Sequence, residues 1–193
     1  MNKIKPKRFP FTINNVQSND DIDMFFMSVA LEEAKTSLKC GDFPIGAVLV
    51  DEYHYLGKER SSAFTDTSWV SHAEMKLFSK YSPYLLGTYR ANPNRYLCLY
   101  TTMEPCIMCF GASILHRVSR IVIACPDPNA GISSVFACNS NVGIFYKSRV
   151  PKIEFGILGK RSCALMIEFS KMGISESSEN IYKTFTALEA TLK

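Results

Sequence analysis

Apolar side chains recur at helical spacing near the start of the chain and predict its first helix. We expect this helix to begin at Asn19 or Asp20, either of which can cap it, and to run through about Lys39. Gly41 follows, as is typical of a helix end. The apolar stripe consists of Ile22, Phe25, Phe26, Val29 and Leu38.

Uninterrupted apolar runs further along predict buried strands. Residues 45–50 are almost wholly apolar, which indicates a strand covered on both faces of a sheet. A hairpin partner is expected directly after it, and three more strands follow. The expected strands span residues 45–50, 53–57, 96–102, 120–125 and 153–157.

Helical patterns and loop patterns alternate with these strands. The expected helices open near His72 and at Pro105 and later span residues 162–171 and 178–193. Stretches rich in polar residues, Gly, Pro and Asn predict loops at residues 59–71, 83–95 and 127–131. Strands that alternate with helices in one chain indicate an α/β fold built as a three-layer α/β/α sandwich.

The composition fits a single domain with an apolar core. Of the 193 residues, 47% are hydrophobic and 21% are charged, which is enough apolar content to build that core. We expect one domain over residues 20–193, preceded by a basic, flexible arm of residues 1–19. No apolar run approaches the roughly 18 residues of a membrane span. The composition also excludes a coiled coil, a repeat array and a small disulfide knot.

Charge and cysteine content indicate the cellular compartment of the protein but do not identify its function. The net charge of +4 permits a phosphate-bearing partner but does not require one. Acidic residues flank the apolar run at residues 24–31 and no cleavage site follows, which argues against a signal peptide. Seven cysteines, scattered over apolar segments, are typical of a reduced compartment, so we expect a cytoplasmic protein.

Two short motifs gather side chains that bind metals. His72-Ala73-Glu74 opens one expected helix, and Pro105-Cys106-Ile107-Met108-Cys109 opens another. Cys106 and Cys109 are three positions apart in a first helical turn, so their sulfurs share a face. The helix N-terminus favours the thiolate form that zinc needs. With a neutral His72, the two thiolates form a three-ligand zinc site whose fourth position holds water.

Glu74 has a different task from the three ligands. It can take a proton from the water on zinc, whose pKa falls to about 7, and pass it to a departing nitrogen. Positions i and i+2 do not share a helix face. His72 and Glu74 can therefore converge only if His72 lies at the helix cap, outside regular helical geometry.

The two motifs resemble the H-x-E and P-C-x-x-C signature of zinc nucleobase deaminases. The chain resembles the cytidine deaminase superfamily and, within it, the branch of tRNA adenosine deaminases and related nucleoside deaminases. This resemblance covers roughly residues 22–172. The segments that carry it are residues 43–50, 72–74, 99–109 and 120–124, with Asp127 and Gly131 in the loop that follows.

The resemblance implies a five-stranded mixed sheet, a bound Zn²⁺ with the hydrolytic water, and a homodimer. It also implies a nucleobase-containing substrate, with tRNA as one candidate. His72, Cys106 and Cys109 would be the zinc ligands and Glu74 the catalytic residue. The substrate contacts that it implies are Ile45, Ser61, Glu104, Pro105 and Asp127.

The sequence departs from this branch at places that bear on the substrate. The branch usually carries an Asn about eleven residues before the motif histidine, where this chain has Ser61. A serine offers one hydroxyl in place of an amide donor and acceptor. In addition, Gly159-Lys160-Arg161 replaces the usual acidic start of the penultimate helix, and the loop at residues 82–95 is a few residues longer than typical.

Other interpretations of these residues stay open. A closed structural zinc site with Cys98 or Cys125 as fourth ligand would leave Glu74 without a role. A redox dithiol at the Cys-x-x-Cys would leave the His-x-Glu motif unexplained. Glu104 either supports a zinc ligand or caps a helix, and Asp127 is either a turn residue or a contact to ribose or phosphate.

The expected function is zinc-dependent hydrolytic deamination of an amino-substituted nucleobase. The favoured substrate is adenosine in RNA, converted to inosine in tRNA. The alternative is a free base, nucleoside or nucleotide, such as guanine, cytosine or deoxycytidylate. A second class of function is that of a non-catalytic partner subunit that keeps the same fold and the zinc. The presence of Glu74 argues against it.

Overall fold

The computed structural model describes residues 19–52, 54–133, 135 and 142–192. Helix α1 (Asn19–Lys39) has the predicted bounds, and Gly41 after it adopts a left-handed φ of +80°, where glycine carries no steric penalty. The predicted basic arm lies outside the described residues except for Asn19, which belongs to α1.

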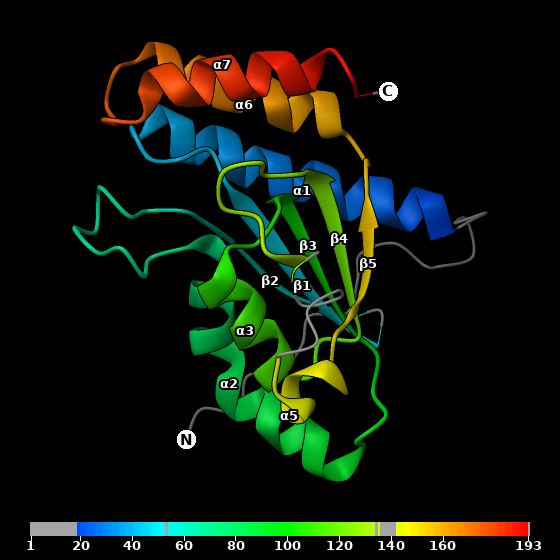
Figure 1. The fold of residues 1–193 in the computed structure, drawn as a ribbon. Coiled ribbons are helices and arrows are strands. Elements are labelled where there is room, and N and C mark those ends of the chain that lie inside the picture. The colour runs from blue at the N-terminus through cyan, green and yellow to red at the C-terminus, as the bar shows by residue number, and fades with distance from the viewer. Residues whose placement is uncertain (1–18, 53, 134, 136–141, 193) are drawn as a thin grey trace.

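A five-stranded mixed sheet forms the middle of the molecule, with strand order β2-β1-β3-β4-β5 (Figure 1). β1 (Gly46–Asp51) pairs antiparallel with both β2 (His54–Arg60) and β3 (Leu97–Met103). β4 (Arg120–Cys125) and β5 (Lys152–Phe155) continue the sheet in parallel pairs beyond β3. Every residue of β1 and β3 is buried, which explains why apolar residues dominate both sequences.

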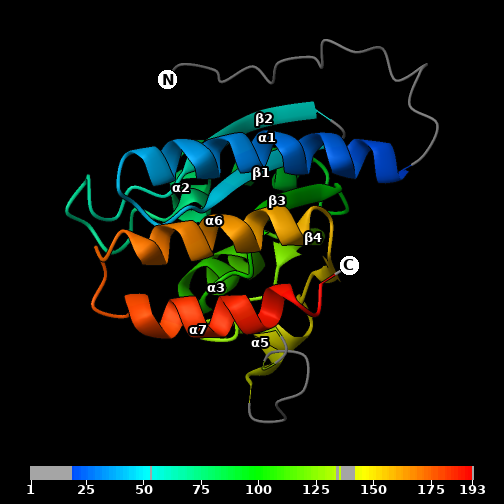
Figure 2. The ribbon, with the colours of Figure 1, turned by 90° about the horizontal axis from the view of Figure 1, so that it is seen from above.

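Helices cover both faces of this sheet (Figures 1 and 2). α2 (Ala73–Ala91) and α3 (Ile107–Leu115) pack on one face, and the four-residue α5 (Ile144–Lys147) lies on the same side. α1 and α6 (Gly159–Lys171) pack on the other face, and α7 (Ser178–Glu189) packs against α6. The predicted three-layer α/β/α sandwich with five strands is confirmed.

Alternate residues of the central strands divide the core into two halves. Leu49 and Leu99 face α2 and α3, where they join Phe78 and Phe110. Their neighbours Val48 and Tyr100 point to the opposite face and pack with α1 through Phe26 and Met27. Full burial of each such side chain stabilises the fold by about 1.5–3 kcal/mol. The sheet is thus fixed on both sides, which gives the ends of β3 and β4 a rigid position.

The prediction of a loop over residues 83–95 is wrong for most of that stretch, because α2 continues through Pro83 to its end at residue 91. A proline inside a helix removes one backbone hydrogen bond and costs about 3 kcal/mol. Tyr81 and Leu85 are buried on either side of it, and the Tyr81 hydroxyl donates to the carbonyl of Leu56 at 2.6 Å. Packing against the sheet therefore outweighs the local preference of proline.

α3 begins two residues later than predicted, at Ile107. Pro105 is thus not the first helical residue, and Cys106 is the N-cap with extended backbone angles of φ −68° and ψ 172°. His72 caps α2 in the same way, with φ −75° and ψ 150°. His72 and Glu74 could converge only if His72 lay at the helix cap, and the structure places it there.

The other boundaries differ from expectation by a few residues. β2 extends to Arg60, α6 begins at Gly159, and α5 has no counterpart among the predicted elements. A Cβ atom on Gly159 would lie 2.7 Å from the carbonyl oxygen of Ala124, so close packing of α6 on β4 requires glycine there.

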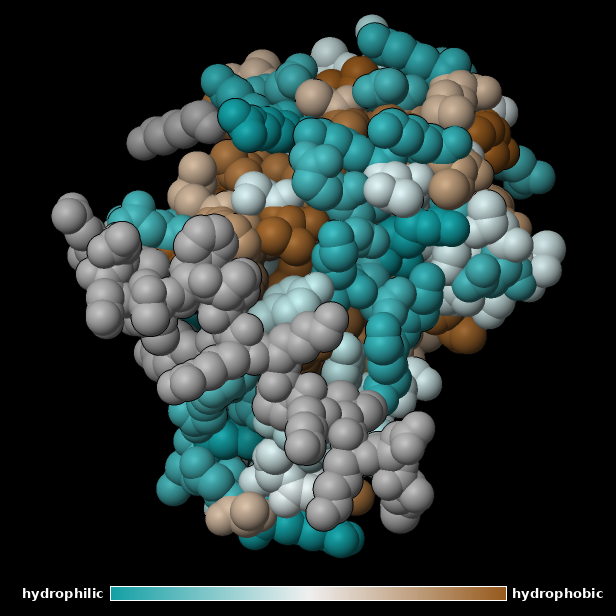
Figure 3. Space-filling model, turned by 180° about the vertical axis from the view of Figure 1, so that it is seen from behind, coloured by the Kyte–Doolittle hydropathy of each residue, from teal (hydrophilic) through white to brown (hydrophobic). Residues whose placement is uncertain are grey.

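Hydrophilic residues cover most of the described surface on the face seen in Figure 3, and the apolar patches between them are small. Within the described part of the chain, no helix combines the length and the apolar character needed to cross a membrane.

Candidate active site

The two motifs meet at one end of the central strands. β3 and β4 are parallel, so the segments after their carboxyl ends lie side by side, as in other open α/β sheets. The first of these segments leads into Cys106 at the start of α3, and His72 at the start of α2 lies beside it. No side chain caps either helix start, so both N-termini direct their backbone N–H groups and positive dipole ends toward this place.

His72, Cys106 and Cys109 form a group with the geometry of a zinc site. Their ligand atoms all lie within 4.8 Å of one another. The Nδ1 atom of His72 is 3.7 Å from the Cys106 sulfur and 3.5 Å from the Cys109 sulfur. Tetrahedral zinc, with Zn–N near 2.0 Å and Zn–S near 2.3 Å, places nitrogen and sulfur about 3.6 Å apart. The donor set and its spacing therefore fit a zinc ion without rearrangement.

The protonation of the two cysteines is already unequal. A hydrogen bond with the Cys109 thiol lowers the pKa of Cys106 to about 4, and the same pairing raises the pKa of Cys109. A hydrogen bond with the Cys106 sulfur raises the pKa of His72. One thiolate is thus favoured before any metal binds, and a zinc ion takes the place of the remaining proton.

Two other cysteines that were considered as a fourth ligand lie elsewhere. Cys98 lines a separate cavity beside Tyr100 and Arg120, and burial raises its pKa to about 12. The Cys125 thiol forms a hydrogen bond with the Cys163 thiol in the core between β4 and α6. In the described ranges, neither belongs to the metal-binding group, so the closed structural site is not what the structure shows.

Glu74 is 3% exposed and points at the same group. The hydroxyl of Thr101 on β3 donates to its Oε1 atom at 3.0 Å, and the Cys109 thiol donates to Oε2 at 3.5 Å. Burial raises the pKa of this carboxyl above its ordinary value. A raised carboxyl pKa beside a metal-binding group is the property that a proton-transferring residue requires.

A cavity of about 300 Å³ opens at this group. Its walls come from the segment before β1, the loop between β2 and α2, the ends of β3 and β4, and helices α6 and α7. A volume of this size is at the lower end of the range of small-molecule sites and is large enough for a nucleobase. Of the five substrate contacts that the resemblance implied, the cavity is lined by Ile45, Ser61, Glu104 and Asp127.

The family model described as "Cytidine and deoxycytidylate deaminase zinc-binding region" matches residues 20–125 of the chain. The chain belongs to this family. It is a zinc-dependent hydrolytic deaminase with a nucleobase-containing substrate.

Two bacterial relatives are similar to more than half of the chain. The chain is 33% identical over 151 residues to a tRNA-specific adenosine deaminase of Buchnera aphidicola, covering 78% of this chain and 90% of the relative. It is 37% identical over 111 residues to a tRNA-specific adenosine deaminase of Bacillus subtilis, covering 58% of this chain and 66% of the relative.

Two solved structures share the fold. One comes from structural work on A-to-I editing by tRNA:A34 deaminases at the wobble position, with a TM-score of 0.56, 24% identity, and coverage of 73% of this chain and 98% of the other. The second is a guanine deaminase of Nitrosomonas europaea, with a TM-score of 0.60, 19% identity, and coverage of 86% and 87%.

Pro105 is the predicted substrate contact that the structure does not place in the deaminase cavity. It is buried, and the described residues that line the cavity do not include it. The reason is the late start of α3, since Pro105 precedes the extended cap residue that turns toward the cavity.

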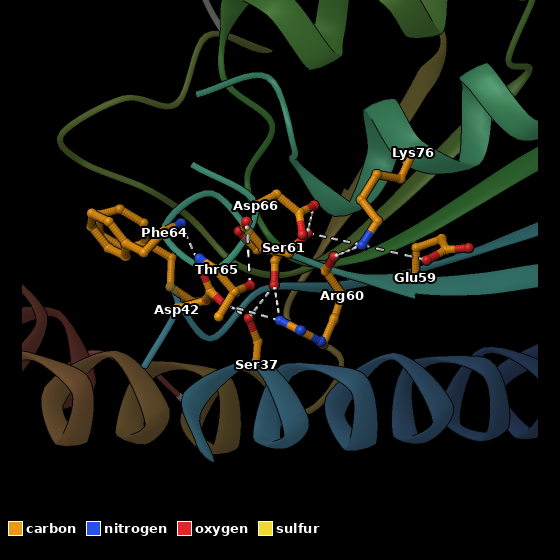
Figure 4. Close-up of polar contacts among 11 residues, drawn as sticks. Ser37, Asp42, Glu59, Arg60, Ser61, Phe64, Thr65, Asp66 and Lys76 are labelled. Carbon is orange, nitrogen blue, oxygen red and sulfur yellow. Dashed lines mark hydrogen bonds and ion pairs between the residues drawn. The ribbon is translucent and has the colours of Figure 1, made fainter. Parts of the chain in front are cut away.

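Ser61 lies at the cavity wall, fixed by its backbone. Its N–H donates to the Ile45 carbonyl at 2.8 Å. Its carbonyl accepts from the Ser37 hydroxyl at 2.6 Å and from Arg60 at 2.8 Å (Figure 4). These contacts use its main chain alone. The Ser61 hydroxyl is the group that remains to meet a ligand in the cavity.

Glu104 holds the loop after β4. Its Oε2 atom accepts from the Asp127 N–H at 3.1 Å, and its Oε1 atom accepts from the Ser133 N–H at 3.2 Å and the Ser133 hydroxyl at 2.5 Å. A Cβ atom on Gly131 would lie 2.4 Å from this carboxylate, so the loop closes over Glu104 only with glycine there. This loop-holding contact is neither of the two roles considered from sequence.

Asp127 is a turn residue, and it also lines the cavity. Its Oδ1 atom accepts from the Asn129 N–H at 2.9 Å, as in an Asx-turn, and its side chain also lines the cavity. Burial raises the pKa of this carboxyl. A turn that also faces the cavity presents Asp127 in a fixed orientation to whatever binds there.

Sequence reasoning missed the contribution of the C-terminal helix. Asn180 of α7 donates through its side-chain amide to the Asn129 side chain at 3.1 Å, which joins α7 to the loop after β4 across the cavity rim. Ile181 and Phe185 line the cavity below them. The two asparagines are far apart in sequence and belong to no motif, so no local pattern could have predicted their contact. Trp69, three residues before His72, was also missed, although a lone aromatic so close to a ligand is a visible signal.

Proposed function

We propose that the chain converts adenosine to inosine in RNA, with a tRNA loop as the substrate, and that Glu74 is its catalytic residue. The observation that carries the reaction is the buried Glu74 carboxylate aimed at the group of His72, Cys106 and Cys109. The choice of adenosine in tRNA is supported by similarity to tRNA-specific adenosine deaminases at 33% and 37% identity.

His72, Cys106 and Cys109 hold the zinc in this proposal. When bound, zinc supplies a Lewis acid that lowers the pKa of a water molecule to about 7. Two thiolates and a neutral imidazole balance the double positive charge of the ion, and the two helix N-termini stabilise the thiolates.

Glu74 moves the proton. Thr101 holds Oε1, so Oε2 is the oxygen that takes the proton from the attacking water. With Cys109 as a metal-binding thiolate, its sulfur, 3.5 Å from Oε2, would have no proton to donate to that oxygen. Glu74 then returns the proton to the departing nitrogen. One water is consumed, the C–N bond breaks as a C=O bond forms, and ammonia leaves.

The cavity walls hold the base and sugar. Ile45 supplies an apolar surface, Ser61 a hydroxyl, and Asp127 a carboxyl that its turn holds in place. Because the reacting base must enter the cavity to reach Glu74, an adenosine within RNA must be unpaired or flipped out of its stack, which costs least in a loop.

A second candidate substrate is a free base or nucleoside. Ser61 favours it, because one hydroxyl replaces the amide that the tRNA adenosine deaminase branch usually carries at this position, and an amide recognises more of a purine edge than a hydroxyl does.

The test is a deamination panel read by mass spectrometry. Zinc-loaded protein is incubated with free bases, nucleosides, nucleotides, single-stranded DNA and an anticodon stem-loop RNA, and each product is detected by the mass change from amine to carbonyl. We expect conversion of the stem-loop, and none with Glu74→Ala. Conversion of a free base or mononucleotide alone would replace the RNA substrate with the second candidate.

A homodimer and a cytoplasmic location belong to the same proposal. The six cysteines in the described ranges are free thiols, in keeping with a reducing compartment. Sedimentation of the zinc-loaded protein across a concentration series tests the dimer.

A further inference from the structure

Trp69 stands at the mouth of the active-site cavity. It is the single tryptophan of the chain, it is 74% exposed, and it lines the same cavity as His72 and Glu74. An exposed indole ring beside a cavity can contact a ligand that lies across the cavity opening. Because Trp69 lies beside a nucleobase pocket, the ligand that it contacts is expected to be part of a nucleobase-containing substrate.

The Trp69 ring is anchored from below by other aromatic rings. It meets Phe64 edge to face, with centroids 5.9 Å apart and planes at 70°. Phe64 stacks on Phe43 at 5.3 Å, and Phe43 packs on the fully buried Phe169 at 4.8 Å. Trp69 is therefore the exposed end of a four-ring cluster rooted in the core.

Hydrogen bonds hold the loop that carries this ring. The buried carboxylate of Asp42 accepts from the N–H groups of Phe64 at 2.7 Å and Thr65 at 3.1 Å, and from the Thr65 hydroxyl at 2.7 Å (Figure 4). The Ser62 N–H donates to the Ser71 carbonyl at 3.0 Å, which joins the two ends of the loop. The ring is thus presented in advance, and little conformational entropy is lost when a ligand covers it.

We propose that Trp69 stacks on a nucleobase adjacent to the reacting one in a single-stranded RNA substrate. The reacting base must enter the cavity to reach Glu74, so the next base along the strand lies nearer the opening, where Trp69 is exposed. Stacking on an aromatic side chain accepts any base, because every base has a π-face. The inference rests on the proposed function, since a free base or nucleoside has no neighbour to stack.

Kinetics separate this role from a purely structural one. With Trp69→Ala, we expect kcat/KM for a stem-loop RNA to fall about tenfold relative to kcat/KM for adenosine, through KM rather than kcat. Trp69→Phe keeps an aromatic face and restores most of the loss. Val70→Ala is the matched control, because Val70 is 59% exposed in the same loop and is not among the described residues that line the cavity. Equal loss on adenosine and RNA would overturn the proposal.

Fluorescence tests the contact directly, because Trp69 is the only tryptophan. Zinc-loaded Glu74→Gln protein, which does not turn over, is titrated with single-stranded RNA and separately with adenosine. We expect quenching by RNA at concentrations where adenosine has no effect. If RNA does not quench, the proposal is wrong, whatever the panel of substrates shows. If Trp69→Ala instead changes the sedimentation of the protein, a second copy of the chain covers this ring and the stacking role is excluded.

The two failures are distinguishable. If the panel shows conversion of a free base but the fluorescence is still quenched by RNA, the proposed reaction fails while the stacking surface stands. If the stem-loop is converted but Trp69→Ala has no effect on its KM, the reaction stands and the stacking role fails.

Discussion

The Thr101 hydroxyl donates to Glu74 Oε1 at 3.0 Å, and both side chains are buried. Thr101 lies on the central strand β3, the best-fixed element of the sheet, whereas Glu74 lies in the first turn of α2. The hydrogen bond joins the proton-transferring carboxylate to the rigid part of the fold. It therefore sets which oxygen of Glu74 is available for proton transfer.

Replacing Thr101 with valine keeps the shape of the side chain and removes this donor. We expect kcat to fall about tenfold because the carboxylate loses its fixed orientation, with KM and zinc content close to wild type. Thr101→Ser, which keeps the hydroxyl, is the control and should recover most of the rate. Steady-state kinetics and metal analysis measure both, and a wild-type kcat for Thr101→Val would show that the contact has no role in turnover.

Gly131→Ala tests the loop that carries Asp127. The added Cβ atom would lie 2.4 Å from the Glu104 carboxylate, so the loop must move away from the cavity wall. We expect KM to rise and the free energy of unfolding to fall by about 1–3 kcal/mol. Gly143→Ala is the matched control, since its nearest neighbour atom would be 4.0 Å away. If the two variants behave alike, the contact between Gly131 and Glu104 does not position the loop.

The parts of the site that could be predicted are those encoded by spacing along the chain. The ligands and Glu74 lie in two short motifs, and the position of His72 at a helix cap followed from the requirement that it converge with Glu74. The continuous helix across Pro83 could not be predicted, because burial of Tyr81 and Leu85 against other elements decides it.

Contacts between segments that are far apart in sequence also could not be predicted from local sequence patterns. The pairing of Asn180 with Asn129 depends on how α7 packs on α6, which no spacing rule gives. The role of Glu104 depends on Ser133, 29 positions further along the chain.

Asp42 is expected to make stability depend on pH. Burial alone would raise its pKa, but hydrogen bonds from Thr65, Phe64 and Arg60 more than compensate and hold the pKa below its ordinary value. A group whose pKa is lowered in the folded state stabilises the protein above its unfolded pKa of about 3.9, and that stability is lost as pH falls through the folded pKa.

Asp42→Asn removes this contribution. We expect the variant to be about 2 kcal/mol less stable than wild type at pH 7, with the difference shrinking below about pH 4. Urea unfolding at a series of pH values measures it. A difference that stays constant across the series would mean that the charge of Asp42 is not what holds the loop at residues 60–66.

Removal of zinc should affect both stability and activity. Zinc that binds only the folded chain stabilises it by mass action, so we expect chelation to lower Tm by about 5–10 °C and to abolish deamination, with recovery on adding zinc. Cys106→Ser should behave like chelated protein. Cys40→Ser, at an exposed thiol, should behave like wild type. Full activity after complete chelation would contradict the role of the metal group.

The most direct test of the account is the zinc content and the deamination rate of Glu74→Gln, measured on the same preparation. The variant keeps the size of the side chain and loses its capacity to accept and return a proton. We predict one zinc per site as in wild type, with a rate at least about 100-fold lower on the substrate that the wild-type protein converts. Loss of zinc together with activity, or a rate close to wild type with zinc bound, would contradict the assignment of Glu74 as the group that moves the proton.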